Sequence, residues 1–264
     1  MTPVPYGCLA ALRDALAVEP FARGDVDPRE TGAGWGDPDT GAGAWWLMFE
    51  QRARLVAVGA PAAVAPLVER TRYDTEAAAT PPARVTLPRG TAPLLPERMR
   101  PVDDVHDWDW LWTPQAPPVQ PAEDLVTWLP ASAAPAVEAL LEAASPTASA
   151  HPGDREVVRW CGVWADAGEP AALVAVAAHT ERVPGRPHLA SVAVRPEARQ
   201  RGLGGAVTAW ITRQLLAEGF PEVSLGMYAW NEPARRLYRR LGYRDDHPFT
   251  SGLTLALAPA TLTP

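Results

Sequence analysis

HLASVAVRPEARQRGLGGAV, residues 188 to 207, is the stretch that decides the fold. An apolar run ending at Val194 predicts a β-strand, and the residues from Leu203 onward have the apolar spacing of a helix. The junction, 199–205, makes the first turn of that helix rich in glycine. Unpaired backbone N–H groups and the positive end of the helix dipole would meet there with few side chains in the way. This combination predicts a place where a diphosphate group can approach the backbone closely.

The same spacing of arginine and glycine occurs at residues 29–34, RETGAG. No strand pattern precedes this copy and no helical pattern follows it. We therefore expect the phosphate site at 199–205 and not at 29–34.

The downstream part of the chain alternates between strand and helix patterns. Strands are expected at 123–129, 156–164, 171–180, 188–194, 223–228 and 251–257; helices are expected at 135–143, from Leu203 to a left-handed stop at Gly219, and within 230–243 up to Gly242. Residues 166–170 should turn a hairpin. This order predicts a mixed α/β domain.

The upstream part suggests a similar order of elements with different turn chemistry. WWLMFE (45–50) and 54–58 suggest strands, the following residues a helix, and ARVTLPRG (83–90) another strand. GAPAAVAP, 59–66, stands where the phosphate turn would be and lacks its glycines. In HDWDWLWT, the tryptophans at 108, 110 and 112 would share one strand face, either in the core or at a substrate or inter-domain surface.

Proline marks the expected boundary between these two parts. The 30 prolines are densest at 113–125, TPQAPPVQPAEDL, which neither a helix nor a central strand can accommodate. We expect an N-terminal α/β domain at 1–115, a Pro-rich linker at 116–122 and a second domain at 123–264.

Composition excludes several classes of protein. The net charge of −7 provides no overall electrostatic footprint for nucleic acid or anionic lipid. Two cysteines are too few for a disulfide framework or a zinc site, so we expect no metal and a reducing compartment. Without a run of about 18 apolar residues or a leader pattern, a cytoplasmic protein is expected.

Residues 122–258 resemble the GNAT superfamily of acetyl-CoA-dependent N-acyltransferases. SVAVRPEARQRGLGGAV (191–207) is similar to its motif A and WNEPARRLYRRLGY (230–243) to its motif B, in the family's order. The resemblance implies a GNAT-like α/β fold for the C-terminal domain and acetyl-CoA as cosubstrate. The smaller N-terminal α/β domain would be either a degenerate GNAT-like repeat or an unrelated cap over the acceptor site.

The resemblance also implies cofactor-binding residues. Val192, Ala193 and Val194 would pair with the pantetheine arm like an added strand, and the N–H of Val192 would donate to the thioester carbonyl. Backbone N–H groups would hold the pyrophosphate, with Arg199 and Arg201 adding positive charge; these donors are Gln200, Arg201, Gly202, Leu203, Gly204 and Gly205.

Asn231 is the single asparagine of the chain. The resemblance implies that its side chain bonds a pantetheine amide. Independently, its position before Glu232 and Pro233 is that of a helix N-cap, and one residue can do both.

Two residues are implied in proton transfer. Tyr238 occupies the position of the acid that protonates the departing CoA thiolate, although a tyrosine packed under the sheet is the other interpretation. Counting back from Val194 places His188 at the position of the base. His179, Glu181 and a water-mediated route remain alternatives.

The expected function is N-acetyl transfer from acetyl-CoA to an acceptor amine by direct attack in a ternary complex. A catalytically inactive acyl-CoA-binding or regulatory module and transfer of a longer acyl group are alternatives. Small amines, amino acids, antibiotics and protein termini are all compatible acceptors, and a monomer and a homodimer are both compatible assemblies.

Overall fold

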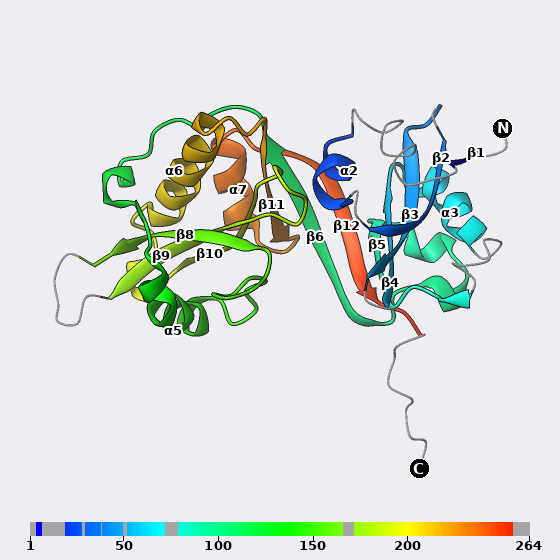
Figure 1. Ribbon diagram of the computed structural model, residues 1–264, viewed down its shortest axis with the longest axis horizontal. Helices are drawn as coiled ribbons and strands as arrows, with labels where there is room; N and C mark the ends of the chain where they lie inside the picture. Colours follow the sequence, from blue (N-terminus) through cyan, green and yellow to red (C-terminus); the bar gives the residue numbers. More distant parts are fainter. Residues whose placement is uncertain are drawn as a thin grey trace, which may run out of the picture. The chain divides into compact units, whose positions relative to one another are not determined.

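The computed structural model describes residues 4–6, 19–27, 30–37, 39–49, 52–71, 79–165 and 172–255. The chain divides into two compact units (Figure 1). Unit 1 is Met1–Trp110, Met227–Trp230 and Asp246–Pro264, and unit 2 is Leu111–Gly226 and Asn231–Asp245. The expected hairpin turn at 166–170, residue 29 of the rejected glycine motif and the end of the expected strand at 251–257 lie outside the described residues.

The strands are hydrogen-bonded in the order β1-β2-β3-β4-β5-β12-β6-β11-β10-β9-β8-β7, a mixed sheet of 12 strands. The prediction of a mixed α/β fold is confirmed. A separate, smaller N-terminal domain is not what the sheet shows, because the N-terminal strands join the same sheet. The last strand explains why: β12 (Arg244–Leu253) pairs antiparallel with β5 (Arg84–Pro88) and so contributes C-terminal residues to unit 1.

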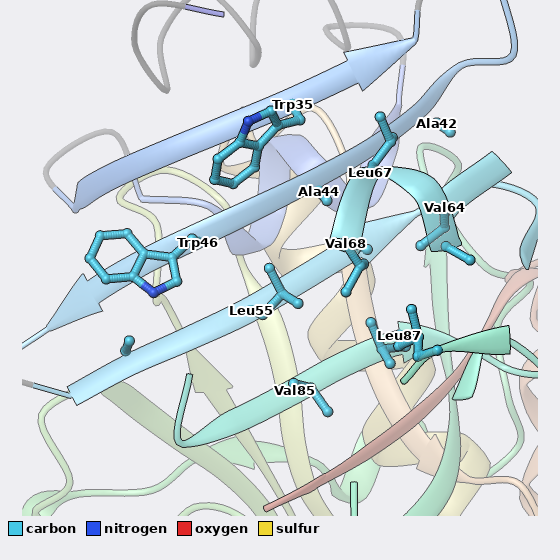
Figure 2. Packing of buried hydrophobic residues seen from close by; sticks show 14 residues of the cluster. Trp35, Ala42, Ala44, Trp46, Leu55, Val64, Leu67, Val68, Val85 and Leu87 are labelled. Atoms are coloured by element: carbon cyan, nitrogen blue, oxygen red, sulfur yellow. The ribbon is translucent and has the colours of Figure 1, made fainter. Parts of the chain in front are cut away.

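Unit 1 begins with β1 (Val4–Tyr6) and α2 (Pro20–Asp25), followed by the antiparallel strands β2 (Thr31–Asp37), β3 (Ala42–Phe49) and β4 (Arg52–Val58). Helix α3 (Pro61–Arg70) then crosses to β5, which runs parallel to β4. Figure 2 shows Val64, Leu67 and Val68 of α3 among buried residues from these strands, including Leu55, Val85 and Leu87. The strand, strand, helix and strand expected in this half are therefore present.

Strand β2 was missed because three glycines interrupt its apolar pattern. Gly32 and Gly34 of the rejected RETGAG motif lie inside this strand. A Cβ built on Gly32 would lie 2.0 Å from the carbonyl oxygen of Trp46, so this glycine permits close approach of β3.

After β5, two 3₁₀ turns (Ala92–Leu94 and Glu97–Met99) lead to β6 (Asp103–Thr113). Trp108 and Trp110 of β6 pack against Phe21 of α2, with ring centroids 6.5 and 5.6 Å apart. The indole N–H of Trp108 donates to Ser251 Oγ at 2.8 Å. These two tryptophans are thus part of the core of unit 1.

Unit 2 contains a 3₁₀ turn at Glu123–Leu125, β7 (Thr127–Trp128), a second turn at Ala131–Ala133, α5 (Ala134–Ala144), β8 (Val157–Trp164), β9 (Leu173–Thr180), β10 (His188–Val194), a third turn at Pro196–Ala198, α6 (Leu203–Ala217), β11 (Val223–Tyr228) and α7 (Glu232–Arg240). Helices α5 and α6 cover opposite faces of β8, β9 and β10 (Figure 1). Strands β6, β11 and β12 contribute residues to both units.

Two expected strands of the downstream part had wrong bounds. The strand expected at 123–129 is reduced to Thr127–Trp128, because the Glu123 carboxylate accepts from the N–H of Gln120 and holds a turn there. The last strand begins at Arg244 rather than at residue 251. Its first residues are polar and hid the strand pattern, yet Asp245 is held by Arg235 and Arg239 of α7 at 2.8 and 2.6 Å.

The Pro-rich segment at 116–122 is packed along α6. Arg213 of α6 donates to the carbonyl oxygen of Pro117 at 3.3 Å and to Glu123 Oε1 at 3.0 Å. Glu123 is buried, so this ion pair anchors the segment to the helix. No helix among the described residues is long and apolar enough to cross a membrane.

Candidate functional site

The junction between β10 and α6 leaves a row of main-chain donors unused. The N–H groups of the six consecutive residues Gln200 to Gly205 have no acceptor among the described residues, and the first bonded amide is that of Ala206, which donates to Gly202 O at 3.0 Å. Gly202 is the N-cap of α6 in a left-handed conformation (φ 79°) and supplies no capping side chain. An anion placed here would meet several donors and the positive end of the helix dipole. We call residues 200–205 the cradle.

The glycines of the cradle have different roles. A Cβ on Gly202 would meet nothing within 4 Å, so that residue is needed for its backbone conformation and faces open space. A Cβ on Gly205 would lie 3.2 Å from Leu237 of α7, and one on Gly204 would lie 3.6 Å from Val194 of β10. These two glycines therefore let the end of β10, the start of α6 and the middle of α7 come together.

The two arginines expected beside the cradle differ. Arg199 donates through Nε to Val194 O at 3.3 Å and through Nη2 to Ala144 O at 3.2 Å. Its guanidinium thus fastens the turn to backbone carbonyls. Arg201 is exposed and pairs with no other described residue, so its charge is available at the surface.

Strand β10 pairs only briefly with β11. The parallel register covers His188↔Ser224 and Leu189↔Leu225, whereas on its other side β10 follows β9 as far as Val194. The register on β9 shifts between Ala190 and Ala193, where Ser191 has a φ of 49°. This is a β-bulge.

The bulge sets the direction of the amides that follow it. Arg195 N donates to Val174 O beside β9 at 2.9 Å. Because donors alternate along a strand, the N–H groups of Val192 and Val194 point away from β9. Those of Arg195 and Ala193 point toward it. Ala193 itself packs in the core beneath α5.

Asn231 is the N-cap of α7, since its Oδ1 accepts from Ala234 N at 3.2 Å. This matches the expected cap. The side-chain amide nitrogen has no hydrogen-bond partner among the described residues. The oxygen of the Asn231 side chain can therefore cap the helix while its amide nitrogen donates to another group.

Tyr238 lies in the last turn of α7 and is buried. Burial raises the pKa of Tyr238 to about 12. Its hydroxyl has no partner among the described residues. Tyr243, whose ring centroid is 6.0 Å away, instead shares a hydrogen bond of 2.6 Å with Thr212 of α6. Tyr243 is thus tied into the core through its hydroxyl and Tyr238 is not.

The three candidate bases lie at neighbouring strand ends. His188 Nδ1 is 2.9 Å from Ser224 Oγ on β11. His179 is buried beside Phe220, and burial lowers its pKa although the nearby carboxylate of Glu181 opposes the shift. Nε2 of His179 lies 3.1 Å from Glu181 Oε1, but neither ring nitrogen makes a well-aligned hydrogen bond. Glu181 also accepts from the N–H of Gly185 at 2.7 Å.

Gln120 is a neighbour of the cradle that the sequence did not reveal. Its Oε1 lies 3.7 Å from the position a Cβ would take on Gly205. Its Nε2 donates to Pro118 O at 2.8 Å. A glutamine among prolines carries no signal of its own, because the packing of this segment on α6 brings it there. Among the described residues, no group of three or more His, Cys, Asp or Glu side chains is arranged to hold a metal ion.

Comparison with known proteins identifies the family of this chain. The Acetyltransferase (GNAT) family model matches residues 103–243. A GCN5-related N-acetyltransferase from Kribbella flavida is 23% identical over 92% of this chain and 95% of its own, with a TM-score of 0.55. A GNAT-family protein from Novosphingobium aromaticivorans is 23% identical over 79% of this chain and 91% of its own, with a TM-score of 0.52.

A third similar structure, an acetyltransferase of the GNAT family from Colwellia psychrerythraea, is 10% identical and covers 96% of this chain and 100% of its own, with a TM-score of 0.51. At these identities the structures show a shared fold, whereas the family model matches more than half of the chain. The chain belongs to the GNAT acetyltransferase family.

Proposed function

We propose that this protein is an N-acetyltransferase that moves an acetyl group from acetyl-CoA to an acceptor amine, by direct attack within a ternary complex. The observation that carries the proposal is the row of unpaired amides from Gln200 to Gly205 at an uncapped helix start. Gln200, Arg201 and Gly202 are exposed, whereas residues 203–205 are buried or partly buried. Buried or partly buried N–H groups are rarely left unpaired, so the second half of the row supports a bound acceptor.

The residues present fit the diphosphate of acetyl-CoA. Gly202 adds no side chain to the open space in front of the cradle, and Arg201 provides an unpaired positive charge beside it. Main-chain donors and a helix dipole suit a doubly charged diphosphate better than a neutral group. When bound, acetyl-CoA supplies an activated thioester acetyl group.

The free edge of β10 suits the pantetheine arm. Beyond Leu189 the described residues of β10 form no further pair with β11, and the N–H groups of Val192 and Val194 point to that side. An extended chain with amide groups can add to such an edge like a strand. In this arrangement the N–H of Val192 donates to the oxyanion that develops on the acetyl carbonyl.

Asn231 is assigned to both of its expected roles. Its Oδ1 caps α7, and its amide nitrogen is the donor offered to a pantetheine carbonyl. The cap fixes the side chain in place, so the donor is pre-oriented before binding.

Tyr238 is assigned as the donor to the departing thiolate. With a pKa raised to about 12, the phenol remains protonated across the physiological range. It is also a weaker acid than a typical thiol, whose pKa is about 8.5. Tyr238 therefore acts mainly by donating a hydrogen bond to the sulfur as negative charge develops there.

His188 is assigned as the base that accepts the amine proton, directly or through water. It is near the start of β10, on the strand that carries the Val192 amide. His179 is less suitable because its ring is buried and pressed against Phe220. Glu181 is already engaged with the Gly185 amide and faces His179.

The proposal is tested by measuring release of free CoA thiol when the protein is incubated with acetyl-CoA and a panel of amines. Turnover with at least one amine, lowered about 100-fold in Tyr238→Phe while CoA affinity is retained, is the expected result. Binding of CoA without turnover on any amine would instead indicate a regulatory acyl-CoA-binding module. Competition between acetyl-CoA and longer acyl-CoAs defines the transferred group.

A further inference from the structure

The hydrogen bond between His188 and Ser224 connects the proposed base to a strand that carries no other assigned residue. Ser224 is on β11, directly opposite His188 in the parallel register. It is buried, and its Oγ lies 2.9 Å from His188 Nδ1 and 3.3 Å from the carbonyl oxygen of Pro187. The main-chain N–H of Ser224 also donates to that carbonyl at 3.1 Å, which fixes the serine against the start of β10.

The direction of these hydrogen bonds decides which ring nitrogen of His188 is protonated. The single hydroxyl proton of Ser224 points either to Pro187 O at 3.3 Å, which only accepts, or to His188 Nδ1 at 2.9 Å. The first arrangement directs the serine proton away from the ring. The Oγ lone pair then accepts from His188 Nδ1, which must carry a proton. In a neutral imidazole only one nitrogen is protonated, so the basic lone pair lies on Nε2.

We propose that Ser224 is a positioning residue for acetyl transfer, which holds neutral His188 in the Nδ1–H tautomer and so leaves the basic lone pair on Nε2. This inference rests on the proposed function, because it assigns Nε2 as the atom that takes the proton of the attacking amine. The proton moves from the amine nitrogen to Nε2 as the N–C bond forms, and the Nδ1–H···Oγ bond stabilises the resulting imidazolium. Ser224 itself neither gains nor loses a proton.

The chain offers a matched control on the same histidine. Thr180 Oγ1 donates to the main-chain carbonyl of His188 at 2.9 Å. Thr180→Val removes that bond, keeps a β-branched side chain and does not alter the contact between Ser224 and the imidazole ring. Ser224→Ala removes the bond to the ring, and Ser224→Thr restores a hydroxyl at the same position.

The tautomer can be measured without any acetyl transfer. In protein labelled with ¹⁵N histidine, the two ring nitrogens of each neutral imidazole distinguish an N–H from a lone pair. The chain has only five histidines, and His188→Gln identifies the His188 signals. We expect the Nδ1–H tautomer in the wild-type protein and in Thr180→Val, and its loss in Ser224→Ala. A wild-type His188 in the Nε2–H tautomer would overturn the proposal, and this result needs no folded variant of Ser224.

The kinetic counterpart uses the same variants with acetyl-CoA and an accepted amine. We expect kcat to fall about 10-fold in Ser224→Ala, with the KM for acetyl-CoA unchanged, recovery in Ser224→Thr and no comparable loss in Thr180→Val. A tautomer that changes in Ser224→Ala without any change in kcat would refute the positioning role and leave acetyl transfer itself intact. No turnover by the wild-type protein on any amine would overturn the proposed function and the positioning role with it.

Discussion

The two halves of the chain contain the same local topology, a strand, a helix and a second parallel strand, with different junctions. In β4–α3–β5 only Gly59 and Ala60 separate strand from helix, and Pro61 opens the helix without an N–H. The amide of Ala62 has no acceptor among the described residues, but those of Ala63 and Val64 donate to Ala60 O at 2.9 and 3.0 Å. In β10–α6–β11 the junction spans residues 195–202 and six successive amides remain unpaired.

The glycines of the two junctions also differ, because one is packed against a neighbouring strand and the other faces open space. A Cβ on Gly59 would lie 2.8 Å from Ala42, so this glycine is needed for packing against β3. A Cβ on Gly202 would meet open space. The comparison teaches that the topology alone does not make an anion site; unpaired donors in front of open space do.

The largest difference between the two junctions is expected when an aspartate is placed at the N-cap of α6 and, separately, at the N-cap of α3. Gly202→Asp puts an N-cap side chain on the cradle amides, and aspartate tolerates the left-handed conformation of that residue. We expect the stability to change by less than about 1 kcal/mol, because an aspartate cap gains only a few tenths of a kcal/mol over glycine and the left-handed conformation costs aspartate a similar amount. We expect CoA affinity to fall about 1,000-fold, the equivalent of losing two charge-assisted hydrogen bonds of about 2 kcal/mol each. Calorimetric titration and urea unfolding measure both effects.

Two controls accompany this variant. Ala60→Asp places a carboxylate at the exposed N-cap of α3 and should stabilise unit 1 without changing CoA affinity. Gly202→Asn has the same shape without the charge, and should lose less affinity than Gly202→Asp. Equal CoA affinity in Gly202→Asp and the wild-type protein would contradict the assignment of the cradle.

The second test separates the two neighbouring tyrosines. Tyr238→Phe should lower kcat about 100-fold and leave folding and CoA affinity unchanged, because its hydroxyl bonds no described residue and is assigned to the thiolate. Tyr243→Phe should keep kcat and lose about 1 kcal/mol of stability, since its hydroxyl bonds Thr212 at 2.6 Å. Steady-state kinetics and chemical unfolding of both variants check this, and the reverse pattern would exchange the roles of the two residues.

The third test divides the two functions of Asn231. Asn231→Asp keeps an oxygen that accepts from Ala234 N and so keeps the cap, but it removes the amide donor. We expect stability to be maintained and CoA affinity to fall about 10-fold, the equivalent of one hydrogen bond. An unchanged affinity would restrict Asn231 to its capping role.

The smallest expected effect is in the pH dependence of stability. Burial raises the pKa of both Tyr238 and Tyr243 above the ordinary value of about 10. Above pH 10 the unfolded chain loses these protons and the folded chain keeps them, so stability falls as pH rises toward 12. We expect a loss of about 1 kcal/mol per tyrosine by pH 11, measured by urea unfolding. The loss should be absent in the double phenylalanine variant.

Much of unit 2 was predictable because local signals and tertiary packing agree there. The helix from Leu203 to the left-handed Gly219 and the cap at Asn231 were visible in the sequence as apolar spacing, glycine and a capping residue. The order of motifs then indicated the family that residues 103–243 match.

What escaped prediction depends on contacts between distant residues. The glycines of β2 interrupt its strand pattern, and Gly32 is needed because β3 packs so closely there. The first residues of β12 are polar and give no strand pattern, and Asp245 among them is held by arginines of α7. The place of Gln120 beside Gly205 depends on how a Pro-rich segment packs on α6. Ser224 has no motif, and only the pairing of β10 with β11 brings it to His188.

The most direct test of the central claim is a calorimetric titration of the folded protein with coenzyme A, alongside Gly202→Asp. The account predicts saturable binding of one CoA per chain by the wild-type protein, and loss of that binding in a variant of similar stability. Absence of CoA binding at millimolar concentration, or undiminished binding by Gly202→Asp, would contradict it.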